Sequence, residues 1–199
     1  MIENRILDDR SFDTLFREAR TYRDWKPGEV TEILLRATYD LMKFGPTSAN
    51  CCPARFVFIK SPEAKARLKP HLDTGNVAQT MSAPVTAIIA HDLKFYEKLP
   101  KLYPEDKSAR GWFEGNAQKA QLAALQNGSL QGAYLMLAAR ALGLDCGPMG
   151  GFNRAGVKAE FFADEDVEPN FLCNIGYGDQ KNLHPRGPRL DFDEACEIL

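Results

Sequence analysis

The sequence has no surplus of positive charge, because 25 lysine and arginine residues are balanced by 27 aspartate and glutamate residues, for a net charge of −2. Binding along a nucleic-acid backbone or to an anionic membrane surface generally requires a basic excess, so we expect neither partner. No apolar run approaches the roughly 18 residues of a membrane-spanning helix. Residues 1–5 carry an acid early and lead into no apolar segment of the kind a signal peptide contains. We therefore expect a cytoplasmic protein.

Motifs for metal binding are also missing. The five cysteines form no C-x-x-C pair, and the three histidines, His71, His91 and His184, lie far apart without an H-E-x-x-H pair. A metal site is therefore not expected. Reduced, buried thiols are the simplest interpretation, and they fit a cytoplasmic protein.

Three further motifs are absent: G-x-G-x-x-G, G-x-x-x-x-G-K-[ST] and G-x-S-x-G. Their absence argues against a Rossmann site, a P-loop and a nucleophile elbow, in that order. Cys51 and Cys52 have no neighbouring histidine in the sequence to act as a base, which favours a structural role for them. A mononucleotide cofactor held by scattered side chains remains open.

The chain has the composition of a globular protein, with 44% hydrophobic and 26% charged residues among 199, and we expect a single domain over residues 1–199. Helices are predicted from apolar residues at helical spacing and from capping residues. The longest of them is apolar on much of its circumference and is therefore expected to be buried. The predicted helices cover residues 12–19 behind Ser11 as cap, 31–44, a short one behind Ser61, 75–81, 118–142 and a short one behind Asn153.

Strands are predicted from β-branched and apolar runs at residues 55–60, 85–90 and 171–176. They are few and separated by helices, which indicates an α+β or α/β domain with helices around a small mixed sheet. Residues 92–116 are aromatic, charged and interrupted by proline and glycine, so only short helices are expected in a segment of the kind that often forms a lid. Residues 143–152 are predicted to form a glycine-rich turn.

Four groups of polar residues are candidates for a binding site. Each has an ordinary structural explanation as well: favourable charges at a helix end, a self-bonded turn, a polar helix surface or a solvated tail. Taken together, arginines from both ends of the chain could clamp one phosphate, and the hydroxyls and amides could bind a planar ring edge. The groups are Arg20, Thr21 and Arg23; Pro46, Thr47, Ser48 and Asn50; Asn76 and Gln79; and Arg186 and Arg189.

Five motifs in sequence order resemble the FMN-dependent nitroreductase family. They are RTYRDW at 20–25, GPTSANCCPAR at 45–55, NVAQ at 76–79, GPMGGF at 147–152 and IGYGD at 175–179. The resemblance spans nearly the whole chain, from about Phe12 to the C-terminus. It is closest to the branch that holds the malonic semialdehyde reductase of the pyrimidine-degradation (Rut) pathway.

The resemblance implies a nitroreductase-like α+β sandwich that forms an obligate homodimer, with two FMN sites at the interface. By position, the phosphate of FMN is expected near Arg20, Thr21, Arg186 and Arg189, and Arg23 near the N1/O2 edge of the flavin. The loop residues Pro46, Thr47, Ser48 and Asn50 are expected along the isoalloxazine from the partner subunit. Asn76 is expected at the pyrimidine edge, and the backbone of Gly150 and Gly151 at N5.

Two positions depart from the family pattern. Many members have lysine where this chain has Gln79, and they often have glutamate where it has Gly150. The first change removes a positive charge near the flavin, which gives an anionic reduced flavin less support. The second changes the size or polarity of the pocket.

The activity implied is hydride transfer from NADH or NADPH through flavin N5 to a small acceptor, with ping-pong kinetics because both substrates use one place. The acceptor expected from the branch is malonic semialdehyde, which gives 3-hydroxypropionate, with Arg110 as a candidate partner for its carboxylate. The alternatives are a broad nitroaromatic or quinone reductase, a flavin carrier without turnover, and a dimer whose flavin site has decayed. No side chain is assigned as a catalytic acid or base.

Overall fold

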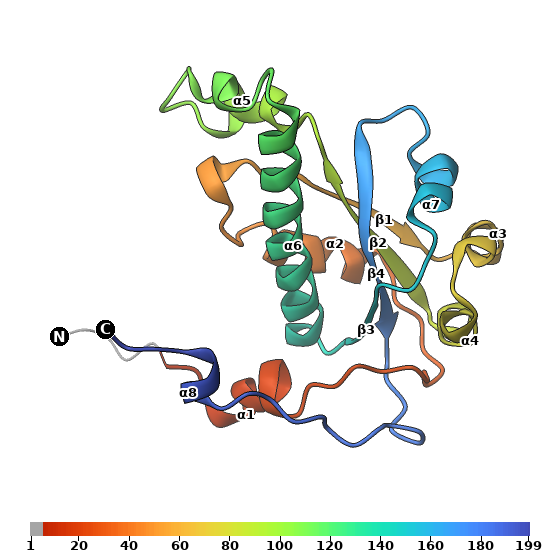
Figure 1. Cartoon of the computed structure of the whole chain (residues 1–199). Helices are drawn as coiled ribbons and strands as arrows, with labels where there is room; N and C mark the ends of the chain where they lie inside the picture. The colour runs from red at the N-terminus through yellow and green to blue at the C-terminus, as the bar shows by residue number, and fades with distance from the viewer. Residues whose placement is uncertain (1–5) are drawn as a thin grey trace.

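The computed structural model describes residues 6–199. The prediction that the chain begins without a signal peptide rests on residues 1–5, which lie outside the described residues. Figure 1 shows a central sheet with helices on both faces and a C-terminal tail that returns past the first helix.

Four strands lie in the order β1-β2-β4-β3. The α+β class is confirmed, with one correction: the three pairs of these strands are all antiparallel, where a mixed sheet is predicted. The order of strands and helices along the chain leaves strand direction open, because direction depends on where each connection returns to the sheet. The strands are β1 (Ala54–Ile59), β2 (Val85–Asp92), β3 (Asp145–Met149) and β4 (Val167–Gly176).

The predicted caps Ser61 and Asn153 are confirmed, since their side chains accept hydrogen bonds from the backbone three residues later. No helix within residues 6–199 combines the length and the apolar character needed to cross a membrane. The helices are α1 (Asp9–Phe12), α2 (Glu32–Met42), α3 (Pro62–Leu68), α4 (Thr74–Ser82), α5 (Leu99–Leu102), α6 (Ala117–Ala141), α7 (Arg154–Phe161) and α8 (Phe192–Ala195).

The first helix begins earlier than predicted. Asp8, and not Ser11, is its cap, because the carboxylate of Asp8 accepts from the Ser11 N–H at 2.8 Å. A carboxylate accepts this bond more strongly than a hydroxyl does and also complements the positive end of the helix. The helix then continues as a wider π-helical turn over Asp13–Arg17.

The strand β3 is missing from the sequence prediction, which assigns these residues to a turn. Gly147 and Pro148 disfavour a strand in isolation. Pairing with β4 and with the N-terminal segment overrides that preference: the Tyr22 N–H donates to the Cys146 carbonyl at 3.1 Å. A Cβ on Gly147 would lie only 2.4 Å from the Tyr22 carbonyl oxygen, so glycine permits this close approach.

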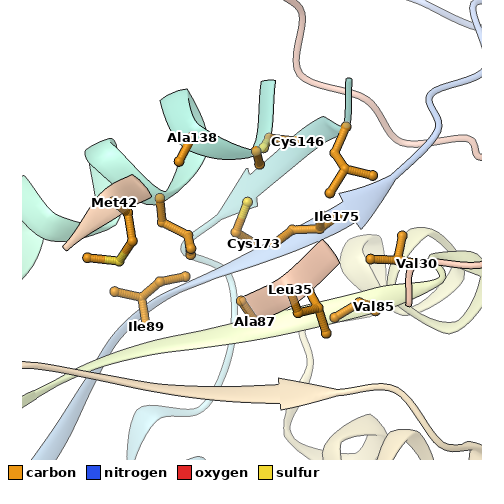
Figure 2. Close-up of a cluster of buried hydrophobic side chains, with 13 residues drawn as sticks. Val30, Leu35, Met42, Val85, Ala87, Ile89, Ala138, Cys146, Cys173 and Ile175 are labelled. Atoms are coloured by element: carbon orange, nitrogen blue, oxygen red, sulfur yellow. The ribbon is translucent and has the colours of Figure 1, made fainter. Parts of the chain in front are cut away.

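Side chains alternate between the two faces of the sheet and form a core on each. On one face, Val85, Ala87 and Ile89 of β2 pack with α2 and α6 (Figure 2). On the other face, Ile88 and Ala90 join a second cluster with residues of α3 and α7. The predicted buried strand is confirmed, since every residue of β2 is buried.

The long helix α6 is buried on one face and exposed on the other, where the sequence predicts a buried helix. Its inner face includes Ala124, Leu135 and Ala139, each fully buried. A Cβ on Gly128 would lie 3.0 Å from the His91 Cβ, so glycine allows α6 to approach β2 closely at this point. The outer face carries exposed apolar side chains, among them Leu122 and Leu130.

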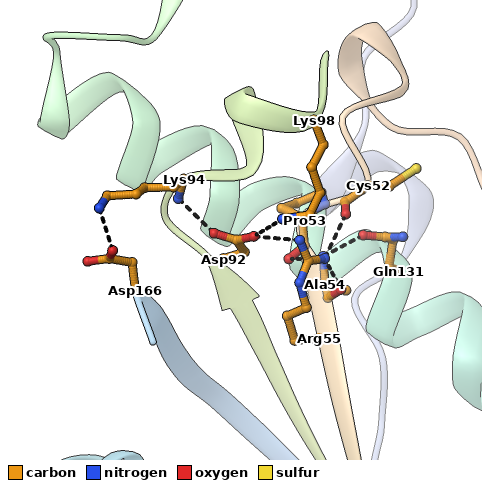
Figure 3. A network of polar contacts seen from close by, with 9 residues as sticks. All are labelled: Cys52, Pro53, Ala54, Arg55, Asp92, Lys94, Lys98, Gln131 and Asp166. Carbon is orange, nitrogen blue, oxygen red and sulfur yellow. Dashed lines mark hydrogen bonds and ion pairs between the residues drawn. The ribbon is translucent and has the colours of Figure 1, made fainter. Parts of the chain in front are cut away.

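The segment 92–116 contains only short helices, as predicted, and a buried carboxylate holds it to the sheet (Figure 3). Asp92 lies 2.5 Å from the Arg55 guanidinium and 3.0 Å from the Lys98 ammonium, and it accepts from the Lys94 N–H at 2.8 Å. Burial by itself would raise the pKa of Asp92, but the Lys98 hydrogen bond and the Arg55 charge outweigh it and lower the pKa. Asp92 is therefore a charged anchor at the start of the segment.

Candidate functional site

A cavity of about 410 Å³ lies where the N-terminal segment, the end of α6 and the C-terminal tail meet. Two predicted groups from opposite ends of the chain share its wall, although more than 160 residues separate them. The predicted site residues that line this cavity are Arg20, Thr21, Arg23, Arg186 and Arg189.

Two titratable side chains of the cavity are missing from the sequence prediction. Arg140 lies in the last turn of α6, and His184 lies in the tail. Neither residue stands out in the sequence, because a helical arginine and a histidine in a polar tail are both ordinary.

Four arginines of the cavity, Arg20, Arg140, Arg186 and Arg189, donate to backbone carbonyls. Arg186 donates to the carbonyls of Arg17 at 2.6 Å and Ala19 at 2.9 Å, Arg20 donates to that of His184, and Arg140 donates to that of Leu15. No carboxylate lines the cavity, and none of its arginines forms an ion pair within the described residues. The cavity therefore keeps an uncompensated positive charge, which favours a phosphate or another polyanion.

A second group gathers at α4 and the end of β3. The Asn76 amide donates to the Gly151 carbonyl at 2.8 Å, and the Gln79 amide donates to the Asn76 side-chain oxygen at 2.5 Å. A Cβ on Gly151 would lie 2.6 Å from the Asn76 amide nitrogen, whereas a Cβ on Gly150 would meet no atom within 4 Å. The backbone is thus closely packed at Gly151 and open at Gly150.

Trp25 connects these two groups within one chain. Its indole N–H donates to the Gln79 carbonyl at 3.1 Å, and its backbone forms an isolated bridge with Gly178. The segment 20–25 therefore runs from the arginine cavity to α4, and Arg23 of the cavity wall lies two residues before Trp25.

The predicted loop residues lie elsewhere. The Ser48 N–H donates to the Asn127 side chain at 2.8 Å, and Arg140 is thirteen residues further along α6, which corresponds to about 20 Å at 1.5 Å per residue. One chain therefore does not bring the loop and the arginine cavity together.

The same loop has a constrained backbone. Ala49, Asn50 and Cys52 adopt positive φ angles of 49°, 47° and 40°, which are uncommon for residues other than glycine. Three bonds hold them: the Thr47 hydroxyl accepts from the Cys52 N–H at 3.2 Å, the Asn50 amide donates to the Leu102 carbonyl at 2.8 Å, and the Asn50 N–H donates to the Thr47 carbonyl at 3.0 Å. Pro46 begins this loop, which is therefore tied to the segment 92–116.

The thiol of Cys51 is structural rather than reactive. Burial raises its pKa to about 11, although the hydrogen bond with Thr47 opposes that shift. A thiol with this pKa is protonated at neutral pH and is a poor nucleophile. Within residues 6–199, no group of three or more metal-ligating side chains is found.

An apolar stripe on α6 faces away from the core. Leu122, Leu130 and Tyr134 are spaced at multiples of four residues and are 65%, 46% and 37% exposed. A Cβ on Gly45 would lie 2.5 Å from the Tyr134 ring, so the stripe continues to the start of the loop 46–50. Contiguous exposed apolar side chains of this kind mark an interface.

Known proteins are similar in sequence to this chain along most of its length. A family model described as the nitroreductase family matches residues 16–177. A Burkholderia lata protein, provisionally named NADH dehydrogenase/NAD(P)H nitroreductase, is 57% identical over 192 residues, which cover 96% of this chain and 98% of the relative. A Stenotrophomonas maltophilia protein with the same provisional name is 57% identical over 195 residues, which cover 98% and 99%.

A solved structure shares the fold. A provisionally assigned nitroreductase of Exiguobacterium sibiricum, crystallised in complex with FMN, matches with a TM-score of 0.85 over 98% of both chains. Its sequence is 23% identical to this chain, so this likeness concerns the arrangement of the backbone.

Proposed function

This chain belongs to the nitroreductase family, and from that premise we propose that it is an FMN-dependent oxidoreductase that uses NADH or NADPH to reduce a small acceptor. The observation that supports this best is the cavity lined by arginines and by no carboxylate. A phosphate group fits that donor set, because guanidinium groups match its oxygens in charge and geometry.

The residues of the cavity and of α4 suit the two ends of FMN. Arg20, Thr21, Arg186 and Arg189 would hold the phosphate, with Arg140 adding charge from α6. Asn76 and Gln79 present amides at the edge of α4, and the open space beside Gly150 leaves room for a planar ring. When bound, FMN supplies hydride transfer through its N5 atom.

The remaining contacts would come from a second copy of the chain. The loop residues Pro46, Thr47, Ser48 and Asn50 lie about 20 Å along α6 from the cavity, and the apolar stripe of α6 adjoins them. We infer that a homodimer brings the loop of one subunit to the cavity of the other. Each site then takes residues from both chains.

The protein's own contribution is electrostatic and steric. Arg23 lines the cavity on the segment that leads to α4, and it would supply a cation that favours negative charge on a reduced ring. A single open face beside Gly150 would receive the donor and the acceptor in turn, which predicts ping-pong kinetics. Proton delivery is assigned to water or to the substrate, since no side chain is placed as its source.

Malonic semialdehyde is our proposed acceptor, with 3-hydroxypropionate as its product. Arg110, the candidate partner for its carboxylate, forms a 2.6 Å ion pair with Glu114, so a substrate would have to compete with that partner. A second candidate is a nitroaromatic or quinone acceptor, which the names of the relatives favour. A ratio of kcat/KM for the nitroaromatic over the semialdehyde of one or more would reject the aldehyde assignment.

The test of the activity itself is an absorption spectrum of the purified protein, followed by anaerobic addition of NADH and then NADPH. Flavin bands that bleach with either donor support a reductase. Bands that persist with both donors point to a flavin carrier. If desalting after incubation with FMN leaves no flavin bands, the cofactor assignment is wrong and a decayed site is favoured.

A further inference from the structure

A buried lysine lies beneath α4 without an acidic partner. Lys65 of α3 is only 4% exposed, and its ammonium donates to the carbonyls of Thr80 at 2.5 Å and Ala83 at 2.6 Å and to the Thr86 hydroxyl at 3.3 Å. No carboxylate pairs with Lys65 anywhere in residues 6–199. Burial lowers its pKa to about 8, so most of the group is still protonated at pH 7.

The Lys65 ammonium lies next to a residue of α4 that adjoins the candidate site. Thr80 follows Gln79 on α4, and the Thr80 hydroxyl lies 3.5 Å from the Met149 sulfur, immediately before Gly150. The Thr86 hydroxyl donates to Asn174 at 2.7 Å, which extends the same polar group into the sheet. The ammonium is thus one layer of residues below the α4–β3 junction that carries the proposed flavin contacts.

An uncompensated charge in this place is costly, because burial removes its hydration and no anion replaces it. An apolar side chain in this place would avoid that cost but would remove the donor that the Thr80 and Ala83 carbonyls receive. A charge that stays buried acts on its surroundings at longer range than a surface charge, since little water screens it. The groups that it faces are carbonyls and hydroxyls, which solvate it without cancelling it.

We propose that Lys65 is a positioning residue whose buried charge acts through α4 to favour reduced, anionic flavin over oxidised flavin at the proposed site. This inference rests on the proposed function, because it requires FMN to bind. It differs from a purely structural role for Lys65, which would hold the end of α4 and change the affinity for both redox states alike.

The experiment measures the midpoint potential of bound FMN and the Kd of oxidised FMN for the whole protein and three variants. Lys65→Met removes the charge and the donor, and Lys65→Gln removes the charge but keeps a donor. Lys69→Met is the matched control, since Lys69 lies four residues away and is exposed. Lys65→Gln also keeps the test valid if the methionine variant fails to fold.

We expect both Lys65 variants to lower the potential, with the affinity ratio of reduced to oxidised FMN falling about tenfold, and the Lys69 variant to match the unmodified protein. An unchanged ratio in the Lys65 variants, with or without a change in the Kd of oxidised FMN, would reduce Lys65 to a structural role. If the unmodified protein binds no FMN, the proposed function fails, and the inference falls with it. That outcome is distinct, because it appears before any variant is compared.

Discussion

At the scale of single residues, the buried Lys65 predicts an unusual dependence of stability on pH. Its pKa is 10.5 in an unfolded chain and about 8 in the folded protein, so between these values the unfolded state binds more protons. The unfolding free energy that Lys65 contributes therefore rises with pH in this window. Between pH 8 and 10 we expect the unmodified protein to gain on the order of 2 kcal/mol relative to Lys65→Met. Urea unfolding of both proteins at the two pH values measures this, and a constant difference would contradict it.

A second residue-scale prediction concerns the phosphate cavity. Arg186→Ala removes one cation and the two bonds to the carbonyls of Arg17 and Ala19. We expect the Kd for FMN to increase at least tenfold, because hydrogen bonds from a charged donor contribute about 1.5–3 kcal/mol. Fluorescence quenching of FMN measures the Kd. Arg154→Ala on α7 is the control, since this exposed arginine lies outside the cavity, and equal effects of both changes would argue against the assignment.

At the scale of elements, the packing of α4 against the end of β3 depends on a glycine. A Cβ at Gly151 would lie 2.6 Å from the Asn76 amide and 2.7 Å from the Asp73 carboxylate, so these side chains must move, and with them the Asn76 hydrogen bond to the Gly151 carbonyl. We expect Gly151→Ala to lower the unfolding free energy by about 1–3 kcal/mol and to weaken FMN binding as well. Gly150→Ala is the neighbouring control, with a change in stability below about 0.5 kcal/mol, because its Cβ meets open space. Thermal unfolding of both variants measures the change in stability, and FMN titration measures the change in Kd.

At the scale of the whole molecule, dimerisation and flavin binding should fail together. Leu130→Asp places a charge in the exposed apolar stripe of α6, where an interface would have to desolvate it. We expect this variant to be a folded monomer by light scattering and circular dichroism, with FMN affinity reduced at least tenfold, because the loop 46–50 of the partner is lost. Ala66→Asp on α3, across the sheet, should leave the dimer intact. A monomer that still binds FMN tightly would show that one chain forms the whole site.

The sequence by itself determined the features that depend on local interactions. The caps Ser61 and Asn153 and the short helices of residues 92–116 follow from interactions within a few residues, and an unbroken apolar run predicts the buried strand β2. The order of five motifs along the chain also indicated the family. Relatives that are 57% identical over nearly the whole chain confirm it.

Only the tertiary structure decided which distant residues meet. It added Arg140 and His184 to the arginine cavity, formed β3 from residues that resemble a turn, and made all the strand pairs antiparallel. It also buried Lys65, which in the sequence is an ordinary lysine of the short helix behind Ser61. Each of these outcomes depends on contacts between residues far apart in the chain. Local propensity contributes a few tenths of a kcal/mol per residue, and such contacts override it.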